Sequence, residues 1–555
     1  MGSKTKTRTP SSERQFDELR ATLRSMLAEE KDDQVITMVI EMLLCMSREN
    51  TALQMRLQKQ LKARFGQSSE KVSGAQLSLF LKIMGADDAE DDETETPDAE
   101  AWREDKELAK HFDEKKEREK EKRRHGRNPL PKHLPRKEII LPVAKSHRIC
   151  SECGSKKQCI GHDKSEVLEW VPGSFQVLVY AREKLACRRC QGKVSIAPVA
   201  DKVIEGGLPG PGLLAEVILK KYKYALPLWR QAEFFATMDV HLAESTMCGW
   251  VQSFAQSAAP IRDEIKRRTL LSRCINTDDS HIRVLDRNHP KGIKRGVMWV
   301  YIGDGLEAFF DYTVDRSRDG PMRILHSYKG KLQADAYSVY DIFFVGDDAT
   351  AIEVGCAMHA RRYFVEALEA GFVVASCAIA WFRYLYKIEE YAKDIGADEE
   401  ERLRIRQQKS APVMKKLHAW MTTQAKVAAP KTPLSDALGY SLRQWDALSQ
   451  FLHDGSLEID NGLAERTIRT LAIGRKNYMF AGSDAGAEAA AVIYSLIASC
   501  KLAGVDTGKY LRDVMIKLAS GWPQAKIGEL VPSSWAQIHG PAKPPPSKAA
   551  QLRPV

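Results

Sequence analysis

Apolar side chains recur along the first part of the chain with the spacing of a helix. Between Val39 and Leu57 they follow one another at alternating intervals of four and three residues, which predicts a helix with one continuous packing seam. Asn50 falls on this seam, where a buried Asn can fix the register of a coiled coil. The pattern predicts either a dimerisation zipper or a helix that packs on its own protein.

Two further helices are predicted before residue 270. Tyr222–Met238 has a helical pattern, and a second helix is expected to begin after the N-capping residues Ser245 and Thr246 and to run through Ser257. Two helices joined by a short turn fit a DNA-reading helix-turn-helix and plain helix packing equally well.

From Cys274 onward the pattern changes to short apolar runs, which predict strands. Helical segments lie between and after these runs, so we expect a mixed α/β region in which the charged stretch from about 365 to 450 is helical. The predicted strands are Cys274–Leu285, Val297–Gly303, Ala308–Val314, Lys331–Asp335 and Thr350–Cys356.

The composition is that of a globular protein. Of the 555 residues, 43% are hydrophobic and 28% are charged, which excludes a mostly disordered chain and predicts several domains. No secretory signal is recognised at the N-terminus. The longest apolar stretches, Gly371–Phe382 and Ala489–Cys500, are shorter than the roughly 20 residues of a membrane span. We therefore expect a cytoplasmic protein without a membrane partner.

The net charge is 84 − 74 = +10, and the basic residues are clustered. Residues 85–100 hold nine acids and no base, and residues 103–124 mix both signs, so we expect a solvated linker followed by an exposed helix or a flexible arm. On the Pro-rich segment that follows, Arg127, Lys132 and Arg136 are candidates for contact with DNA phosphates. The alternative is a solvated charged face.

Four of the eleven cysteines form two CxxC pairs, separated by 187 − 153 − 1 = 33 residues. Two such pairs complete the tetrahedral shell of one structural zinc ion and leave no open position for catalysis. Val167–Ala181 is expected to supply the strands that bring the pairs together, and Arg188 and Arg189 are further candidates for DNA contact. The predicted ligands are Cys150, Cys153, Cys187 and Cys190, with Cys159 spare.

Three acids stand where metal-assisted chemistry would need them. Asp278 lies on the first strand of the α/β region, Asp335 ends a later strand, and Glu465 lies on a helix. Carboxylates at neighbouring strand ends, joined by one from a helix, can hold two divalent ions, and oxygen ligands favour Mg²⁺ or Mn²⁺. Isolated acids are more often surface charge, so the residues alone leave both interpretations open.

Several strings of residues resemble the transposases of the insertion sequence 66 family, and together they cover nearly the whole chain. They are Arg64–Lys71, Arg127–Arg136, the paired CxxC module, Leu226–Gln231, Gly355–Arg362, Ile459–Asp484 and Gly486–Leu511.

The resemblance implies a ribonuclease-H-like catalytic core with a DDE triad, which is carried over to Asp278, Asp335 and Glu465. The first aspartate is usually followed by Glu-Thr in the family, but here it is followed by Asp279-Ser280, so Asp279 becomes a rival ligand. Asp460 is a weaker rival of Glu465, and Asn461-Gly462 replaces a paired Asn.

The expected architecture is therefore a multi-domain α and α/β chain. It comprises a leucine-zipper-like region (1–84), a charged linker with a basic arm (85–137), a four-cysteine zinc-binding module (138–200), a helical region (201–270), the catalytic domain (271–482) with its helical insertion at about 365–450, a C-terminal helical segment (483–540) and a disordered tail (541–555).

The function expected from this resemblance is that of a bacterial DNA transposase. It would bind double-stranded DNA, namely the terminal inverted repeats of its element and target DNA, and would cleave and join strands with two Mg²⁺ or Mn²⁺ ions. A homodimer or higher oligomer on DNA, accessory proteins of the same element and a nucleoid-associated location are also expected. Further candidates for DNA contact are His359, Arg361, Arg362, Arg466 and Arg469.

Two other functions fit parts of the pattern. A non-catalytic, zinc-dependent DNA-binding regulator would account for all N-terminal features, but it has no use for the three acids. A hydrolysis-only ribonuclease-H-like nuclease would use the acids without joining strands. On the helix, Glu465 and Arg469 are four residues apart, so this Arg could bind a phosphate or form an intrahelical ion pair.

Overall fold

The computed structural model describes residues 101–123, 173, 175–178, 184–185, 195–196, 201–204, 207–346 and 349–540. The chain divides into two compact units, one of Ala109–Ala200 and one that combines Met1–Leu108 with Asp201–Val555. The predicted N-terminal seam, acidic linker, basic arm and four zinc ligands lie outside the described residues, as does the C-terminal tail.

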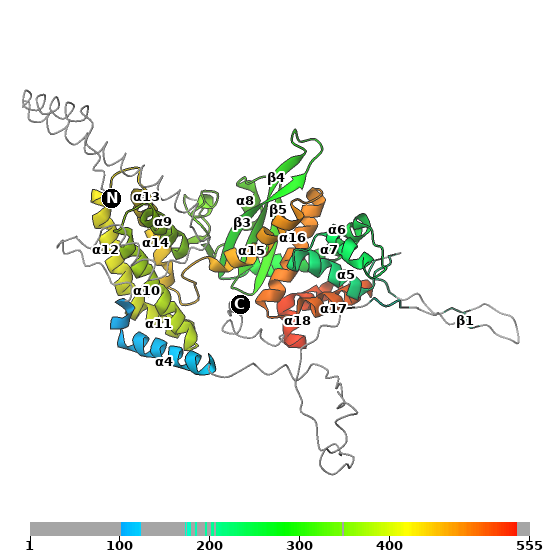
Figure 1. The fold of residues 1–555 in the computed structure, drawn as a ribbon, viewed down its shortest axis with the longest axis horizontal. Coiled ribbons are helices and arrows are strands. Elements are labelled where there is room, and N and C mark those ends of the chain that lie inside the picture. Colours follow the sequence, from blue (N-terminus) through cyan, green and yellow to red (C-terminus); the bar gives the residue numbers. More distant parts are fainter. Residues whose placement is uncertain are drawn as a thin grey trace, which may run out of the picture. The chain divides into compact units, whose positions relative to one another are not determined.

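A five-stranded mixed sheet forms the centre of the larger unit, with the strand order β5-β4-β3-β6-β7 (Figure 1). Its first three strands are antiparallel, and the last two run parallel to β3. All five predicted strands are confirmed, the first with its predicted bounds and the other four with shifted ends. Their bounds are β3 (Cys274–Leu285), β4 (Ile293–Gly303), β5 (Glu307–Thr313), β6 (Lys331–Gln333) and β7 (Ile352–Val354).

Helices cover both faces of this sheet. In β4 the last eight residues are buried without interruption, which requires protein on both sides of the strand. The helix α15 (Gly462–Tyr478) packs on β3 and β4, while α7 (Glu244–Leu270) and α16 (Asp484–Leu502) pack on β5.

The edge strand β5 is closed by side chains of α16. The backbone N–H groups of Ala308 and Phe310 donate to the hydroxyls of Ser499 (3.0 Å) and Ser495 (2.8 Å), which lie one helical turn apart. This arrangement satisfies backbone donors that would otherwise offer pairing to another chain. By length and composition α16 could cross a membrane, but two thirds of its most apolar window is buried inside the protein, as expected of a core helix.

The region before the sheet is helical, but one predicted helix is interrupted. In place of one helix over Tyr222–Met238, the structure has η4 (Leu219–Lys223) and α6 (Leu228–Ala236), preceded by α5 (Pro211–Ile218). The break contains Ala225 with a left-handed φ of 56° and Pro227, whose missing N–H cannot extend a helix.

The helix α7 begins earlier and runs further than predicted. Its N-cap is Ala243 without a side-chain cap bond, so the prediction that Ser245 and Thr246 cap it is wrong, and it continues past Pro260 to Leu270. Its first basic residue is Arg262, and its apolar side packs on the sheet. Plain helix packing is therefore favoured over a recognition helix.

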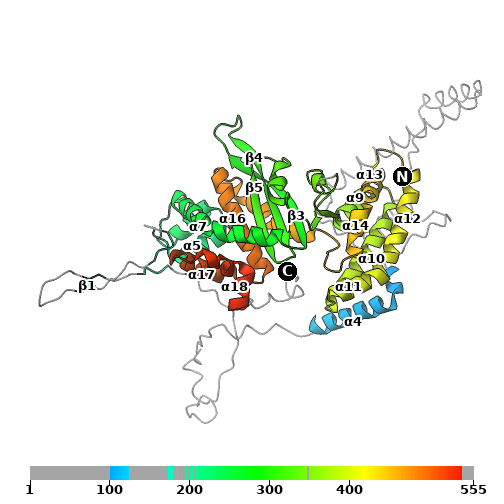
Figure 2. The same cartoon turned by 180° about the vertical axis from the view of Figure 1, so that it is seen from behind.

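The segment between β7 and α15 is helical (Figure 2), and its helices pack around one apolar cluster to which Cys274 of β3 and Val354 of β7 also contribute. Its elements are α9 (Ala357–Glu369), α10 (Ala375–Asp394), α11 (Glu399–Ile405), η6 (Arg406–Ser410), α12 (Ala411–Val427), α13 (Pro433–Arg443), α14 (Trp445–Ser449) and η7 (Gln450–Leu452). The remaining elements of the larger unit are η2 (Ala101–Glu104), α8 (Asp319–Leu325), η5 (Asp341–Phe343), α17 (Thr507–Ala519), η8 (Gln524–Leu530) and α18 (Pro532–His539).

The charged stretch after residue 103 forms the helix α4 (Lys106–Arg123), whose first turn is fixed to the helical segment. Asp105 accepts from Lys409 (2.7 Å), Glu107 accepts from Tyr391 (2.5 Å), and the Leu108 side chain is fully buried. The predicted helix is therefore present, and most of its described residues are exposed, but its first turn is held in place and is not a flexible arm.

In the smaller unit, two short strands flank the second CxxC pair. They are β1 (Lys184–Leu185) and β2 (Ser195–Ile196), which pair antiparallel. The zinc-ribbon strands were expected in Val167–Ala181, but the residues that the structure describes there, 173 and 175–178, are not in a strand.

Candidate active site

Two of the predicted acids follow the point where parallel strands β3 and β6 pair. The pairing ends with Asn276 opposite Gln333; Asp278 lies two residues further along β3, and Asp335 lies two residues beyond the end of β6. Adjacent strands lie about 4.8 Å apart, and residues two apart share a face. Glu465 comes from the first turn of α15, which packs on β3.

The negative charges of the other acids act on Asp278. Burial, together with the charges of Asp335, Asp279 and Glu465, raises the pKa of Asp278 to about 7, against one hydrogen bond from the Asp279 backbone N–H (2.8 Å) that lowers it. Burial and the charge of Asp279 also raise the pKa of Asp335, while Arg316 opposes this. Carboxylates that destabilise one another in a buried position favour a proton or a cation between them.

The rival acid Asp279 is bound to an arginine. Its two carboxylate oxygens accept from Arg316 Nη2 (2.7 Å) and Nε (3.0 Å), and the guanidinium lies 3.9 Å from the ring centre of Tyr337. Only 6% of the Asp279 side chain is exposed, so this bidentate pair compensates its buried charge. Asp279 is therefore less available to a metal ion than Asp278.

The other rival, Asp460, accepts a hydrogen bond at the start of α15. One carboxylate oxygen accepts from the Gly462 backbone N–H (2.8 Å), and the other accepts from the Tyr386 hydroxyl (2.7 Å). Gly462 leaves room for this arrangement, since a Cβ there would lie 2.7 Å from both Asp460 Oδ1 and Arg466 Nη1.

His359 approaches Glu465 from the first turn of α9. Its Nε2 lies 3.7 Å from Glu465 Oε1, and Cys356 joins them so that one potential ligand atom of each lies within 4.8 Å of the others. Such a mixed sulfur, nitrogen and oxygen set suits zinc better than magnesium. Burial raises the pKa of the Cys356 thiol to about 12, and its sulfur accepts from the Asn461 N–H (3.2 Å).

The predicted DNA-contacting residues fall into three groups. Arg466 and Arg469 are exposed on α15, whereas His359, Arg361 and Arg362 are partly buried on α9. The remaining five, Arg127, Lys132, Arg136, Arg188 and Arg189, lie outside the described residues.

Two arginines near the acids were not predicted from the sequence. Arg316 pairs with Asp279, and Arg475 donates to the Ser280 hydroxyl (2.8 Å) and to the His281 carbonyl. Both lie far along the chain from their partners, and no periodicity or spacing marks them.

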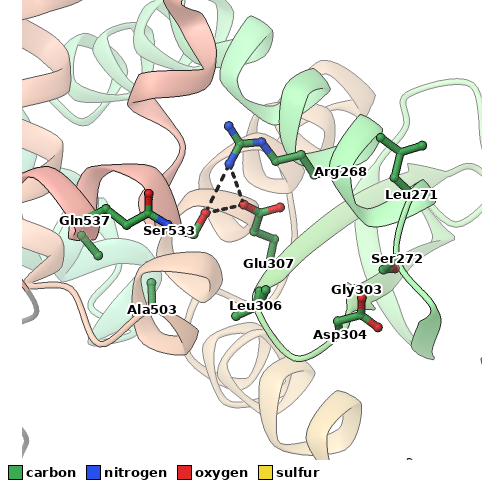
Figure 3. Close-up of a pocket in the computed structure, with 11 residues that line it drawn as sticks. Arg268, Leu271, Ser272, Gly303, Asp304, Leu306, Glu307, Ala503, Ser533 and Gln537 are labelled. Atoms are coloured by element: carbon green, nitrogen blue, oxygen red, sulfur yellow. Dashed lines mark hydrogen bonds and ion pairs between the residues drawn. The ribbon is translucent and has the colours of Figure 1, made fainter. Parts of the chain in front are cut away.

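The structure also contains a pocket of about 490 Å³ that does not include the three acids (Figure 3). Arg268 of α7, Glu307 of β5 and Ser533 of α18 meet at its wall, where Arg268 Nη1 lies 3.2 Å from Glu307 Oε1 and the Ser533 hydroxyl donates to the same oxygen (2.5 Å). These contacts fix α18 to the sheet.

Comparison with known proteins gives the family. The family model described as "Transposase IS66 family" matches residues 206–489, about half of the chain, and "IS66 C-terminal element" matches residues 495–533. The "zinc-finger binding domain of transposase IS66" matches residues 147–191, which contain both CxxC pairs, and "Transposase C of IS166 homeodomain" matches residues 52–139.

Three similar proteins come from Sinorhizobium fredii (strain NBRC 101917 / NGR234). "Uncharacterized protein y4hP" is 30% identical over 75% of this chain and 78% of its own length, and y4jD is 31% identical over 73% and 81%. A third, y4qI, is 32% identical over 72% and 76%. With the match over the sheet and its helices, these findings show that the chain belongs to the IS66 family of transposases and carries that family's zinc-finger module.

Proposed function

We propose that this transposase cuts DNA at the ends of its element and joins the freed 3′ ends to target DNA. In the first step a water attacks a phosphodiester, which leaves a 3′-hydroxyl and a 5′-phosphate. In the second step the 3′-hydroxyl attacks a target phosphodiester, and the broken strand leaves with its own 3′-hydroxyl. Neither step needs a covalent protein nucleophile.

The residues that would hold a pair of Mg²⁺ or Mn²⁺ ions are Asp278, Asp335 and Glu465. The observation that carries this proposal is the pKa of Asp278, raised to about 7 by burial and then by the other acids, because a buried cluster of oxygen donors fits a hard cation. When bound, such ions lower the pKa of the attacking water and stabilise the leaving oxygen. A ribonuclease-H-like core is part of the proposal, supported by the mixed sheet, with Asp278 on β3 and Asp335 just beyond the end of the neighbouring strand β6.

DNA would be bound by basic groups on both units. Arg466 and Arg469, exposed on the helix of Glu465, are suited to phosphates beside the acids, together with His359, Arg361 and Arg362. The basic arm with Arg127, Lys132 and Arg136, and Arg188 and Arg189 of the zinc module, would add contacts. We also propose that Cys150, Cys153, Cys187 and Cys190 hold the zinc ion, and that two DNA ends are served by at least a dimer.

The test is cleavage of duplex DNA that carries the terminal repeats flanking the coding frame, in the presence of Mg²⁺. We expect Asp278→Asn, Asp335→Asn and Glu465→Gln each to lower the cleavage rate by at least about 100-fold, because each removes a charge that acts on the transition state. Asp446→Asn, an exposed acid on α14, serves as the control and should cleave like the parent.

Two outcomes would change the proposal. If Asp335→Asn cleaves as fast as the parent, the assignment of the acids is wrong. If the parent cleaves but forms no joined products with target DNA, the protein is a hydrolysis-only nuclease, because joining requires attack by the 3′-hydroxyl.

A further inference from the structure

Each of the three proposed metal-binding acids is preceded by a buried amide residue two or four positions earlier in the chain. One pair shares a face of β3, the second consists of the last residue of β6 and an acid just beyond it, and the third consists of the N-cap residue of α15 and an acid in its first turn. The amide side chains are 0 to 6% exposed. The pairs are Asn276 with Asp278, Gln333 with Asp335, and Asn461 with Glu465.

The three amides are hydrogen-bonded to one another. Asn276 Nδ2 donates to Gln333 Oε1 (2.7 Å) and to Asn461 Oδ1 (3.2 Å). Asn276 lies on β3, Gln333 ends β6, and Asn461 is the N-cap residue of α15. A single side chain thus links the strand of Asp278, the strand end that precedes Asp335 and the start of the helix of Glu465.

Backbone carbonyls hold the other two amides in place. Asn461 Nδ2 donates to the Thr277 carbonyl (2.7 Å), and Gln333 Nε2 donates to the carbonyls of Gly355 (3.1 Å) and Glu458 (2.9 Å). The Asn461 carbonyl in turn accepts from the Glu465 backbone N–H (3.3 Å). These donors and acceptors fix the orientation of each amide and the start of the helix relative to the sheet.

Neutral amides suit this place for an electrostatic reason. The neighbouring acids already repel one another, so further acids below them would add to the repulsion, and lysines would compete with a metal ion for the carboxylates. An apolar layer would pack, but it would not fix the register of two strands and a helix as directional hydrogen bonds do. A buried amide network orients the strands and the helix through directional hydrogen bonds and adds no charge.

We infer that Asn276, Gln333 and Asn461 are positioning residues, which hold the three acids at the separation that a metal pair requires. This inference rests on the proposed function. Metal sites depend on ligand placement to within about 0.5 Å, and the amides lie about 6–7 Å along the backbone from the acids that they position. Loss of one amide should therefore weaken metal binding more than it weakens the fold.

Gln333→Met tests this inference, and the chain offers a matched control. Gln231 is also fully buried, and its Nε2 donates to two backbone carbonyls, those of Val217 (3.3 Å) and Leu226 (3.0 Å), but it is not part of the network. Gln231→Met thus removes the same group from a similar environment. Mn²⁺ binding is measured by electron paramagnetic resonance on the full-length, zinc-loaded chain, and unfolding midpoints are measured in parallel.

We expect Gln333→Met to weaken Mn²⁺ binding at least five-fold and to raise the Mg²⁺ concentration for half-maximal cleavage by a similar factor, while Gln231→Met changes neither. If Gln333→Met unfolds more readily than Gln231→Met, the comparison is made with Asn276→Ser, which keeps a short donor and should weaken Mn²⁺ binding about two- to five-fold.

Unchanged Mn²⁺ binding in a folded Gln333→Met or Asn276→Ser chain would overturn the positioning role and leave the amides as fold-stabilising groups. Failure of the proposed function would give a different result. In that case Asp278→Asn and Asp335→Asn would leave the Mn²⁺ binding of the parent unchanged.

Discussion

The ionised carboxylate of Asp278 affects both the stability of the protein and its proposed function. Its pKa is about 7 in the folded chain and near 3.8 in an unfolded chain. Between these values the folded state keeps a proton that the unfolded state has released, so stability decreases as the pH rises through this window, and the penalty is complete above pH 7. The charge that would bind a metal ion thus destabilises the metal-free protein.

Asp278→Asn should therefore stabilise the metal-free chain. In chelator at pH 8, we expect a melting temperature a few degrees above that of the parent, because the amide cannot ionise. Below about pH 4, where the parent carboxyl is protonated in both states, the difference should disappear. Added Mg²⁺ should raise the melting temperature of the parent alone. Equal melting temperatures in chelator at pH 8 would contradict the raised pKa.

At this scale the sequence predicted the candidate acids but not their partners. Asp278, Asp335 and Glu465 could be named because the family resemblance carried the triad onto them. The ion pair of Asp279 with Arg316 and the hydrogen bond of Asp460 with Tyr386 could not be predicted, because these partners lie 37 and 74 residues away along the chain. Only the fold brings such side chains together.

At the scale of elements, a buried arginine connects the helical segment to the chain that leads into α15. Arg406 of η6 is fully buried, and its five N–H donors all have acceptors. It donates to both carboxylate oxygens of Glu389 on α10 (2.8 and 2.7 Å), and to the carbonyls of Phe451 (3.1 Å), Asp454 (3.0 Å) and Leu457 (2.8 Å). One side chain thus fixes α10 and the loop before α15 together.

Arg406→Ala should cost about 3–5 kcal/mol in the free energy of unfolding, because it leaves the carboxylate of Glu389, whose side chain is only 13% exposed, and three backbone carbonyls without their partner. The matched control is Arg404→Ala on α11, whose pair with Glu401 is exposed and whose loss should cost less than about 1 kcal/mol. Urea unfolding followed by circular dichroism measures both. Similar costs for the two variants would show that Arg406 does not hold this segment together.

Elements were predicted well where one periodicity ran without interruption. Each strand of the sheet follows from a short apolar run, and β3 has its predicted bounds of Cys274–Leu285. The single helix predicted over Tyr222–Met238 failed because apolar spacing continues through a backbone break at Ala225 and Pro227. Side-chain pattern reports burial, whereas local backbone geometry decides where a helix stops.

At the scale of the whole molecule, the zinc-finger module and the proposed carboxylate site fall in different compact units. The zinc-finger match lies within residues 109–200, while the candidate acids lie in the unit that contains the sheet. Thiolate ligands select zinc, and carboxylates select magnesium or manganese. One chain could therefore bind both kinds of ion at separate sites without the ions replacing one another. A small zinc module depends on its ion for folding, whereas the sheet has a large apolar core.

Loss of zinc should therefore impair DNA binding while leaving the acid site intact. We expect Cys187→Ser to release zinc, measured by metal analysis, and to weaken binding to element-end DNA at least ten-fold, while Mn²⁺ binding stays at the parental level. Cys159→Ser, which changes the cysteine predicted to be spare, is the control and should retain zinc. Equal zinc loss in both variants would reject the four-cysteine assignment. Loss of Mn²⁺ binding in Cys187→Ser would instead mean that the acid site depends on the zinc module.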